Sequence, residues 1–256
     1  MKLPQVGAQI YTVREHLKTP RQFAQTIDRL KSIGYCAVEL IHSDNVTDHE
    51  IAKICDAAGV AVAAAHVRET SIIEQPESVA EKLKILGTKI GVYAFPRGVD
   101  LASSLEVEKL ADGLERSAAI LNGHGSVLAY HNHALEFARV GKERVYDVIR
   151  SRAPGLSFEL DAYWAQYGGM NPESLVRSLG DRLVALHLKD FGVTSGHGGA
   201  PFMTEVGYGN LGFRTLIAEA ERGGCQWFIV EQDVTPGDPF DSLERSFRYI
   251  RDELVA

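Results

Sequence analysis

The sequence predicts an α/β fold: one (β/α)8 barrel that forms a single domain over residues 1–256. Short apolar runs alternate with helix-like stretches eight times along the chain. The runs are rich in Val, Ile, Leu and Ala, which is typical of parallel strands that are covered on both faces. Eight such units in 256 residues also match the size of a TIM barrel. The predicted strands begin near Gln5, Tyr35, Val60, Lys89, Ser126, Leu156, Leu183 and Trp227.

Helix boundaries between the strands follow ordinary start signals. Thr19, Asn171 and Asp238 each precede a proline, and this order is typical of an N-cap residue followed by the first residue of a helix. Thr47 and Glu50 have the spacing of a capping box. A doubly wound open sheet is the competing fold, but it usually carries a phosphate-binding turn after its first strand, and the sequence has none there.

The composition disfavours several classes of partner. The formal net charge is −7, which argues against binding to nucleic acid or to an anionic membrane. No apolar run reaches the ~18 residues of a transmembrane helix, and the first residues lack the apolar stretch of a signal peptide. Cys36, Cys55 and Cys225 have no metal-ligand spacing, so we expect reduced thiols and a cytoplasmic protein.

Four apolar runs each stop at a Glu, Asp or His, the residue types that bind metal ions. In a barrel, the carboxyl ends of the strands point to one mouth. Because side chains alternate along a strand, residues two apart share a face, and polar side chains facing the helices would cost ~2–7 kcal/mol each. We therefore expect four pairs to face the mouth: His131 with His133, Glu159 with Asp161, His187 with Lys189, and Glu231 with Asp233.

Several of these residues have a structural interpretation beside the functional one. Lys189 either contacts a substrate oxygen or forms an ion pair with Glu159. Glu39 and His66, at the ends of the second and third predicted strands, are either structural or site residues. Trp164 either belongs to the core or offers an aromatic face to the C–H surface of a sugar.

A glycine-rich segment, residues 207–212, matches G-x-G-x-x-G. It does not directly follow a strand and lacks a βαβ context, so a dinucleotide site is disfavoured. Its backbone amides could bind a substrate phosphate, but the segment more simply ends a long loop over residues 191–210. Long loops in compact domains are usually functional or mobile, and we interpret this one as a partial lid.

The motifs at the strand ends also resemble a known family. Tyr-His-Asn-His-x-x-Glu-Phe, Leu-Asp-x-Tyr-Trp, His-Leu-Lys-Asp and Val-Glu-Gln-Asp are similar to those of the sugar phosphate isomerase/epimerase family, which has a xylose-isomerase-like TIM barrel. The resemblance covers essentially the whole chain. The motif set indicates the superfamily but not the substrate, because members include isomerases, epimerases, dehydratases and lyases.

The resemblance implies one divalent metal ion, Mn²⁺, Mg²⁺, Co²⁺ or Zn²⁺. It implies Glu136, Asp161, His187 and Glu231 as the metal ligands. His131 is the alternative for the ligand on the fifth strand, because some relatives carry a carboxylate at its position. We expect the substrate to be bound by Glu39, His66, His131, His133, Trp164 and Lys189.

These residues suggest a sugar or sugar phosphate isomerase or epimerase. It would abstract a proton next to a carbonyl through a metal-stabilised enediolate, with Glu136 and Glu231 as base and acid. The alternatives are a metal-dependent lyase or hydrolase that acts on a keto-glycoside by elimination, and a sugar-binding barrel without catalysis. An apurinic endonuclease would need a basic surface for DNA, which the acidic composition disfavours. Whether the chain forms a homo-oligomer stays open.

Overall fold

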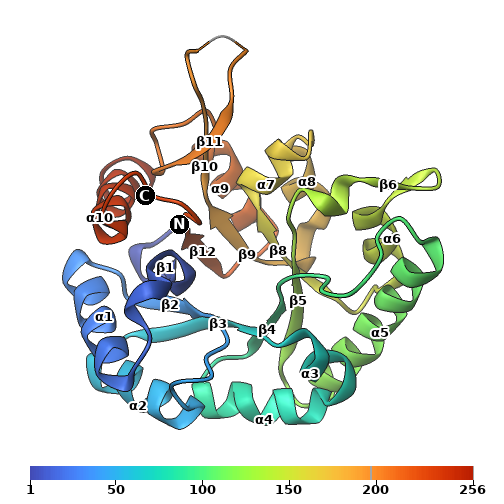
Figure 1. Cartoon of the computed structure of the whole chain (residues 1–256), viewed down its shortest axis with the longest axis horizontal. Coiled ribbons are helices and arrows are strands. Elements are labelled where there is room, and N and C mark those ends of the chain that lie inside the picture. Colours follow the sequence, from blue (N-terminus) through green and yellow to red (C-terminus); the bar gives the residue numbers. More distant parts are fainter. Residues whose placement is uncertain (197, 256) are drawn as a thin grey trace.

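The computed structural model, which describes residues 1–196 and 198–255, is a closed barrel of parallel strands surrounded by helices (Figure 1). The strands follow one another around the barrel in the order β1-β12-β9-β8-β5-β4-β3-β2. This confirms the predicted fold, and each strand begins within two residues of the predicted position. The barrel strands are β1 (Val6–Gln9), β2 (Ala37–Leu40), β3 (Ala61–Val67), β4 (Ile90–Tyr93), β5 (Val127–His131), β8 (Ser157–Asp161), β9 (Leu183–Leu188) and β12 (Trp227–Val230).

Helices cover the outside of the barrel, and the four whose starts the sequence predicts, α1, α2, α8 and α10, begin there. The side chains of Thr19 and Asn171 accept hydrogen bonds from the first turn of α1 and α8, and Thr47 forms the predicted capping box with Glu50. The helices are α1 (Pro20–Ile33), α2 (Asp48–Ala58), α3 (Glu69–Glu74), α4 (Pro76–Leu86), α5 (Ser104–Gly123), α6 (Val145–Arg152), α7 (Ala162–Tyr167), α8 (Pro172–Leu179), α9 (Phe213–Arg222) and α10 (Pro239–Tyr249).

Two small hairpins extend from the barrel. One joins β6 (Arg139–Val140) to β7 (Glu143–Arg144), and the other joins β10 (Asp190–Val193) to β11 (Pro201–Thr204). Figure 1 shows the β10–β11 hairpin projecting outward, away from the barrel centre. The long loop predicted after the seventh barrel strand is thus partly a hairpin.

The buried side chains differ between two parts of the barrel, the layer between strands and helices and the carboxyl ends of the strands. Apolar side chains such as Leu30 of α1 and Leu114 of α5 fill the layer between strands and helices. Toward the carboxyl ends of the strands, the buried side chains are polar, and Gln9, Glu39 and Glu159 are fully buried there. This polar layer is where the predicted site residues gather.

No helix in the described part of the chain is both long and apolar enough to cross a membrane. Cys36, Cys55 and Cys225 all carry free thiols.

Candidate active site

Four buried side chains meet at the carboxyl ends of four neighbouring barrel strands. They are His131 at the end of β5, Asp161 at the end of β8, His187 in β9 and Glu231 directly after β12. Their potential ligand atoms all lie within 4.8 Å of one another. The sheet register explains this meeting, because Asp161 pairs with His187, and His187 pairs with Ile229, two residues before Glu231. We call these four residues the rim group.

The donor set of the rim group fits a divalent cation. Oδ2 of Asp161 is buried and has no hydrogen-bond partner among the described residues. Nδ1 of His187 lies 3.1 Å from Oε2 of Glu231 and 3.8 Å from that Asp161 oxygen. Burial holds the pKa of His131 well below its usual value, so its imidazole is neutral, as a metal ligand must be. Two carboxylates and two imidazoles without a thiolate suit Zn²⁺, Mn²⁺ or Co²⁺, and Mg²⁺ less well.

Glu136, which the resemblance implied as a ligand, lies outside the rim group. It belongs to the short 3-10 helix Leu135–Phe137 after β5 and is fully buried. Its Oε1 accepts a hydrogen bond from the Tyr130 hydroxyl at 3.0 Å, and its Oε2 accepts one from the backbone N–H of His133 at 2.8 Å. Both oxygens therefore hold the loop in place, and burial raises the pKa of Glu136 to about 7. His131, the alternative for the fifth strand, stands in the rim group instead.

Lys189 is buried against three carboxylates. Its Nζ lies 2.7 Å from Oδ1 of Asp233, 3.0 Å from Oε2 of Glu231 and 3.4 Å from Oδ2 of Asp161. Burial disfavours the charged amine, but these carboxylates outweigh burial and hold the pKa of Lys189 above its usual value. The predicted ion pair with Glu159 is not among its contacts. Lys189 instead forms ion pairs with two members of the rim group, Asp161 and Glu231.

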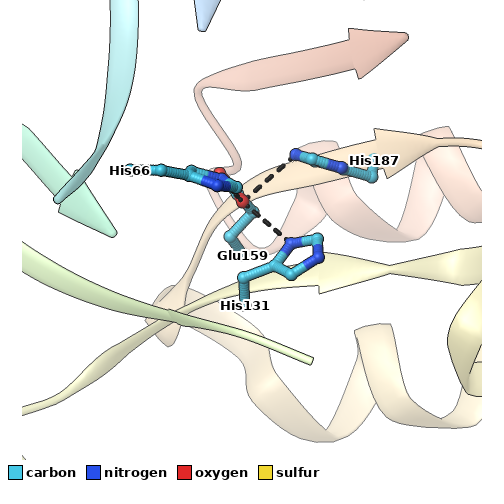
Figure 2. A group of neighbouring side chains, drawn as sticks. All are labelled: His66, His131, Glu159 and His187. Atoms are coloured by element: carbon cyan, nitrogen blue, oxygen red, sulfur yellow. Dashed lines mark hydrogen bonds and ion pairs between the residues drawn. The ribbon is translucent and has the colours of Figure 1, made fainter. Parts of the chain in front are cut away.

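A second buried layer, formed by Glu39, His66 and Glu159, lies beside the rim group. Figure 2 shows the contacts of Glu159 with the surrounding histidines. Oε1 of Glu159 lies 3.0 Å from Nε2 of His66, 3.0 Å from Nδ1 of His131 and 3.1 Å from Nε2 of His187. Oε2 of Glu39 lies 2.8 Å from the same His187 nitrogen. The sequence predicted Glu39 and His66 as substrate-binding residues. Both lie in this layer, where His66 contributes to the wall of the cavity described below and Glu39 is fully buried.

The charge of His66 follows from this layer. Burial alone would lower the pKa of its imidazole, but Glu39 and Glu159 outweigh burial and raise that pKa to about 10. Glu39 also accepts a hydrogen bond from Nε2 of Gln9 at 2.8 Å. The layer thus contains an imidazolium between two carboxylates.

A cavity of about 510 Å³ opens beside these groups. His66, His131, Lys189 and Glu231 contribute to its wall, so both buried layers are accessible from it. Loop residues after the first four strands complete the wall with aromatic and charged side chains, among them Tyr11, Asp44, Arg68, Phe95 and Arg97.

His133 and Trp164 lie together near the cavity. Their ring centroids are 5.6 Å apart, and Nζ of Lys189 lies 5.4 Å from the Trp164 ring. Nδ1 of His133 and Nε1 of Trp164 are buried and have no hydrogen-bond partner among the described residues. Burial lowers the pKa of His133 to about 4, so it is neutral at pH 7. Both remain predicted substrate contacts.

The glycine-rich segment is held by an internal carboxylate. Asp190 accepts hydrogen bonds from the backbone N–H groups of Gly207, Gly209 and Leu211 at 2.9 to 3.1 Å. A Cβ at Gly209 would overlap the Asp190 side chain. These three amides are therefore not free for a substrate phosphate. The sequence indicated no role for Asp190.

Two other residues of the site received no role from the sequence. Asp233 closes the ion-pair cluster on Lys189, and Gln9 fixes Glu39. The sequence pattern could have pointed to both residues, because Asp233 shares a predicted strand face with Glu231 and Gln9 is the last residue of the first strand.

Known proteins share this architecture. The family model described as the xylose isomerase-like TIM barrel matches residues 27–253. The chain belongs to this family. This confirms the resemblance seen in the strand-end motifs.

Individual relatives are more distant. An inosose dehydratase of Geobacillus kaustophilus (strain HTA426) is 37% identical over 86 residues, a match that spans 33% of this chain and only 28% of that protein. A sugar phosphate isomerase/epimerase from Parabacteroides distasonis ATCC 8503 superposes with a TM-score of 0.80 at 19% identity, covering 99% of this chain and 95% of the other. A xylose isomerase-like TIM barrel protein from Mycobacterium smegmatis in complex with magnesium gives a TM-score of 0.75 at 12% identity, covering 98% and 96%.

Proposed function

We propose that this protein is a metal-dependent enzyme that abstracts a proton next to the carbonyl of a sugar or sugar phosphate, as an isomerase or epimerase does. The rim group carries this proposal, because it joins two carboxylates and two imidazoles at one end of a cavity. The family and the isomerase/epimerase fold neighbour support the same reaction class.

In this proposal His131, Asp161, His187 and Glu231 hold one divalent cation. The cation would polarise the substrate carbonyl and stabilise the negative charge that develops as the adjacent proton leaves. The magnesium complex of the Mycobacterium smegmatis fold neighbour supports a metal in this kind of barrel.

The chain's own residues would supply the proton chemistry. Glu231 contributes to the cavity wall and is the carboxylate best placed to take a proton from the substrate. Lys189, which also contributes to the wall, would bind a substrate oxygen and hold Glu231 in place through their 3.0 Å ion pair. His66, which is charged and contributes to the wall, would return a proton to the substrate. Glu136, whose oxygens are engaged by Tyr130 and His133, would shape the site rather than act in the reaction.

Elimination is a second candidate that starts from the same step. If the carbon next to the one that loses its proton carries a leaving group, the electron pair of the enediolate would form a double bond between these two carbons, and the leaving group would depart with its own bonding pair. The match to an inosose dehydratase, although it covers a third of this chain, favours keeping this candidate. A keto-glycoside is the corresponding substrate for a lyase.

The decisive experiment exposes metal-loaded protein to a panel of aldoses, ketoses, keto-inositols and keto-glycosides in D₂O. Isomerase or epimerase activity would place deuterium on the carbon next to the carbonyl, and elimination would release water or the aglycone. Protein stripped with a chelator is the matched control. Binding of a sugar with neither exchange nor elimination would indicate a binding protein and contradict the proposal.

A further inference from the structure

We infer that Glu159 is a positioning residue that sets the ring orientation and the proton location of His131, His187 and His66 through one carboxylate oxygen. This inference rests on the proposed function only where it concerns metal affinity. The hydrogen-bond arrangement itself can be tested without a metal.

The geometry concentrates three imidazoles on a single atom. Oε1 of Glu159 lies 3.0 Å from His66, 3.0 Å from His131 and 3.1 Å from His187, and these rings come from β3, β5 and β9 (Figure 2). Glu159 is fully buried on β8, and its neighbour in the sheet register is His131.

The number of protons available on Glu159 determines which ring nitrogens must donate to it. Burial, together with the charge of Glu39, raises the pKa of Glu159. Oε1 makes hydrogen bonds with Nε2 of His66 and Nδ1 of His131, whereas the hydrogen bond of His187 Nε2 goes to Glu39. Even a protonated carboxyl carries only one proton on a given oxygen, so at least one of these two rings must donate an N–H to Oε1. The simplest arrangement has a carboxylate that accepts from both rings and also lies beside His187.

The consequence for the rim group is specific. Nε2 of His187 donates to Glu39 at 2.8 Å and lies 3.1 Å from Glu159, so Nδ1 is the nitrogen left for a metal. This Nδ1 lies 3.1 Å from Glu231 and 3.8 Å from Asp161, and a cation bound there would replace its proton. If Nδ1 of His131 donates to Glu159, its Nε2 is left as the ligand atom. A hydrogen bond to one ring nitrogen thus fixes which nitrogen can bind a metal, as carboxylates commonly do for metal-binding histidines.

The same three rings and Glu159 could themselves surround a cation, since their potential ligand atoms also lie within 4.8 Å of one another. If a cation sat there as well as in the rim group, His131 and His187 would have to use both ring nitrogens for metals at once. A positioning role needs only neutral imidazoles in the rim group and one cation. The number of metal ions per chain separates the two interpretations.

Glu39 provides a matched control within the same layer. Its Oε2 lies 2.8 Å from Nε2 of His187 and 3.5 Å from Nε2 of His66, but among the described residues it makes no hydrogen bond or ion pair with His131. Replacing Glu39 should therefore disturb His187 and leave the ring of His131 as it is.

The experiment measures the ring nitrogens by NMR in metal-free protein with ¹⁵N-labelled histidine, with signals assigned through His131→Asn and His187→Asn. In the wild type we expect the proton of neutral His131 on Nδ1, although free histidine favours Nε2. Glu159→Leu should move it to Nε2, Glu159→Gln should give an intermediate result, and Glu39→Gln should leave it on Nδ1. Metal affinity of both Glu159 variants, measured by competition with a chelator, should fall ~10- to 100-fold.

An unprotonated Nδ1 of His131 in the wild type would overturn the inference, and this observation needs no variant that might fail to fold. Unchanged metal affinity in both Glu159 variants, or two metal ions per wild-type chain, would also overturn it. If the wild type shows the Nδ1 proton but takes up no metal, the positioning network stands and the proposed function fails.

Discussion

Nζ of Lys189 lies 3.0 Å from Oε2 of Glu231, and both side chains are buried at the barrel mouth. The same ammonium reaches Asp161 and Asp233, so three carboxylates share one positive charge. A divalent cation on the rim group would complete the neutralisation, because three negative charges would then meet three positive ones. The charge balance of the site therefore depends on both Lys189 and the metal.

The first prediction concerns metal content. Wild-type protein should bind one divalent ion per chain, and Asp161→Ala and His187→Ala should lose it, because each removes a donor from the rim group. Both variants should remain folded, since the strand and helix layers supply the stability. Elemental analysis after metal loading and desalting measures the content. Glu136→Gln, which lies outside the rim group, is the control and should retain the metal.

The second prediction concerns Lys189. Lys189→Met should lower the free energy of unfolding of metal-free protein by ~3–5 kcal/mol, because it leaves buried carboxylates without their counter-charge. The loss should be smaller in metal-loaded protein, where the cation compensates. Lys189→Arg keeps the charge and is the control. Urea denaturation with and without metal gives both values, and equal losses under the two conditions would show that Lys189 and the cation do not share these carboxylates.

Turnover should also report on Lys189. If the ammonium binds a substrate oxygen, Lys189→Met should raise KM or reduce kcat while the metal content stays unchanged. Normal kinetic constants in the metal-loaded variant would restrict Lys189 to a structural role.

The fourth prediction separates two buried glutamates. Glu231→Gln should reduce turnover by at least ~100-fold, because it removes the proposed base. Glu136→Gln should reduce it much less, since the amide oxygen of the new side chain can still accept from Tyr130 or from the backbone of His133. Both variants replace a carboxylate with an amide, so the ratio of their turnover rates reports the different roles of the two glutamates and not the substitution itself. Equal, large losses of turnover in both variants would show that Glu136 also takes part in the proton transfer.

The barrel was predictable from the sequence because its signals are local. The strand starts lie within two residues of prediction, since apolar runs and helix caps such as Thr19 and Thr47 act over a few neighbouring positions. Three of the implied metal ligands also gather as expected, because strand ends in a barrel must converge.

The remaining features depend on contacts between distant parts of the chain. Glu136 points into the loop, where the Tyr130 hydroxyl and the backbone N–H of His133 donate hydrogen bonds to it. The spacing of residues along the sequence does not predict this orientation of the side chain. The carboxylate that pairs with Lys189 is likewise set by strand register, which puts Glu231 and not Glu159 beside it. Sequence brought three of the implied ligands to one rim, but the partner of each side chain, and the places of Glu136, Asp233 and Gln9, required the structure.

The last prediction concerns pH. Burial raises the pKa of Glu136 from 4.5 to about 7, so the folded protein holds this proton more tightly than the unfolded chain. The stabilisation is fully present below pH 4.5 and is lost as the pH rises toward 7, a change of about 3 kcal/mol in the free energy of unfolding. Glu136→Gln cannot lose a proton there, so its stability relative to wild type should rise between pH 5 and pH 8 by an amount of this order. Urea denaturation of both metal-free proteins across this range measures the difference, in which the other titrating groups cancel. A difference that does not vary with pH would mean that Glu136 titrates normally and is not held in a buried, protonated form.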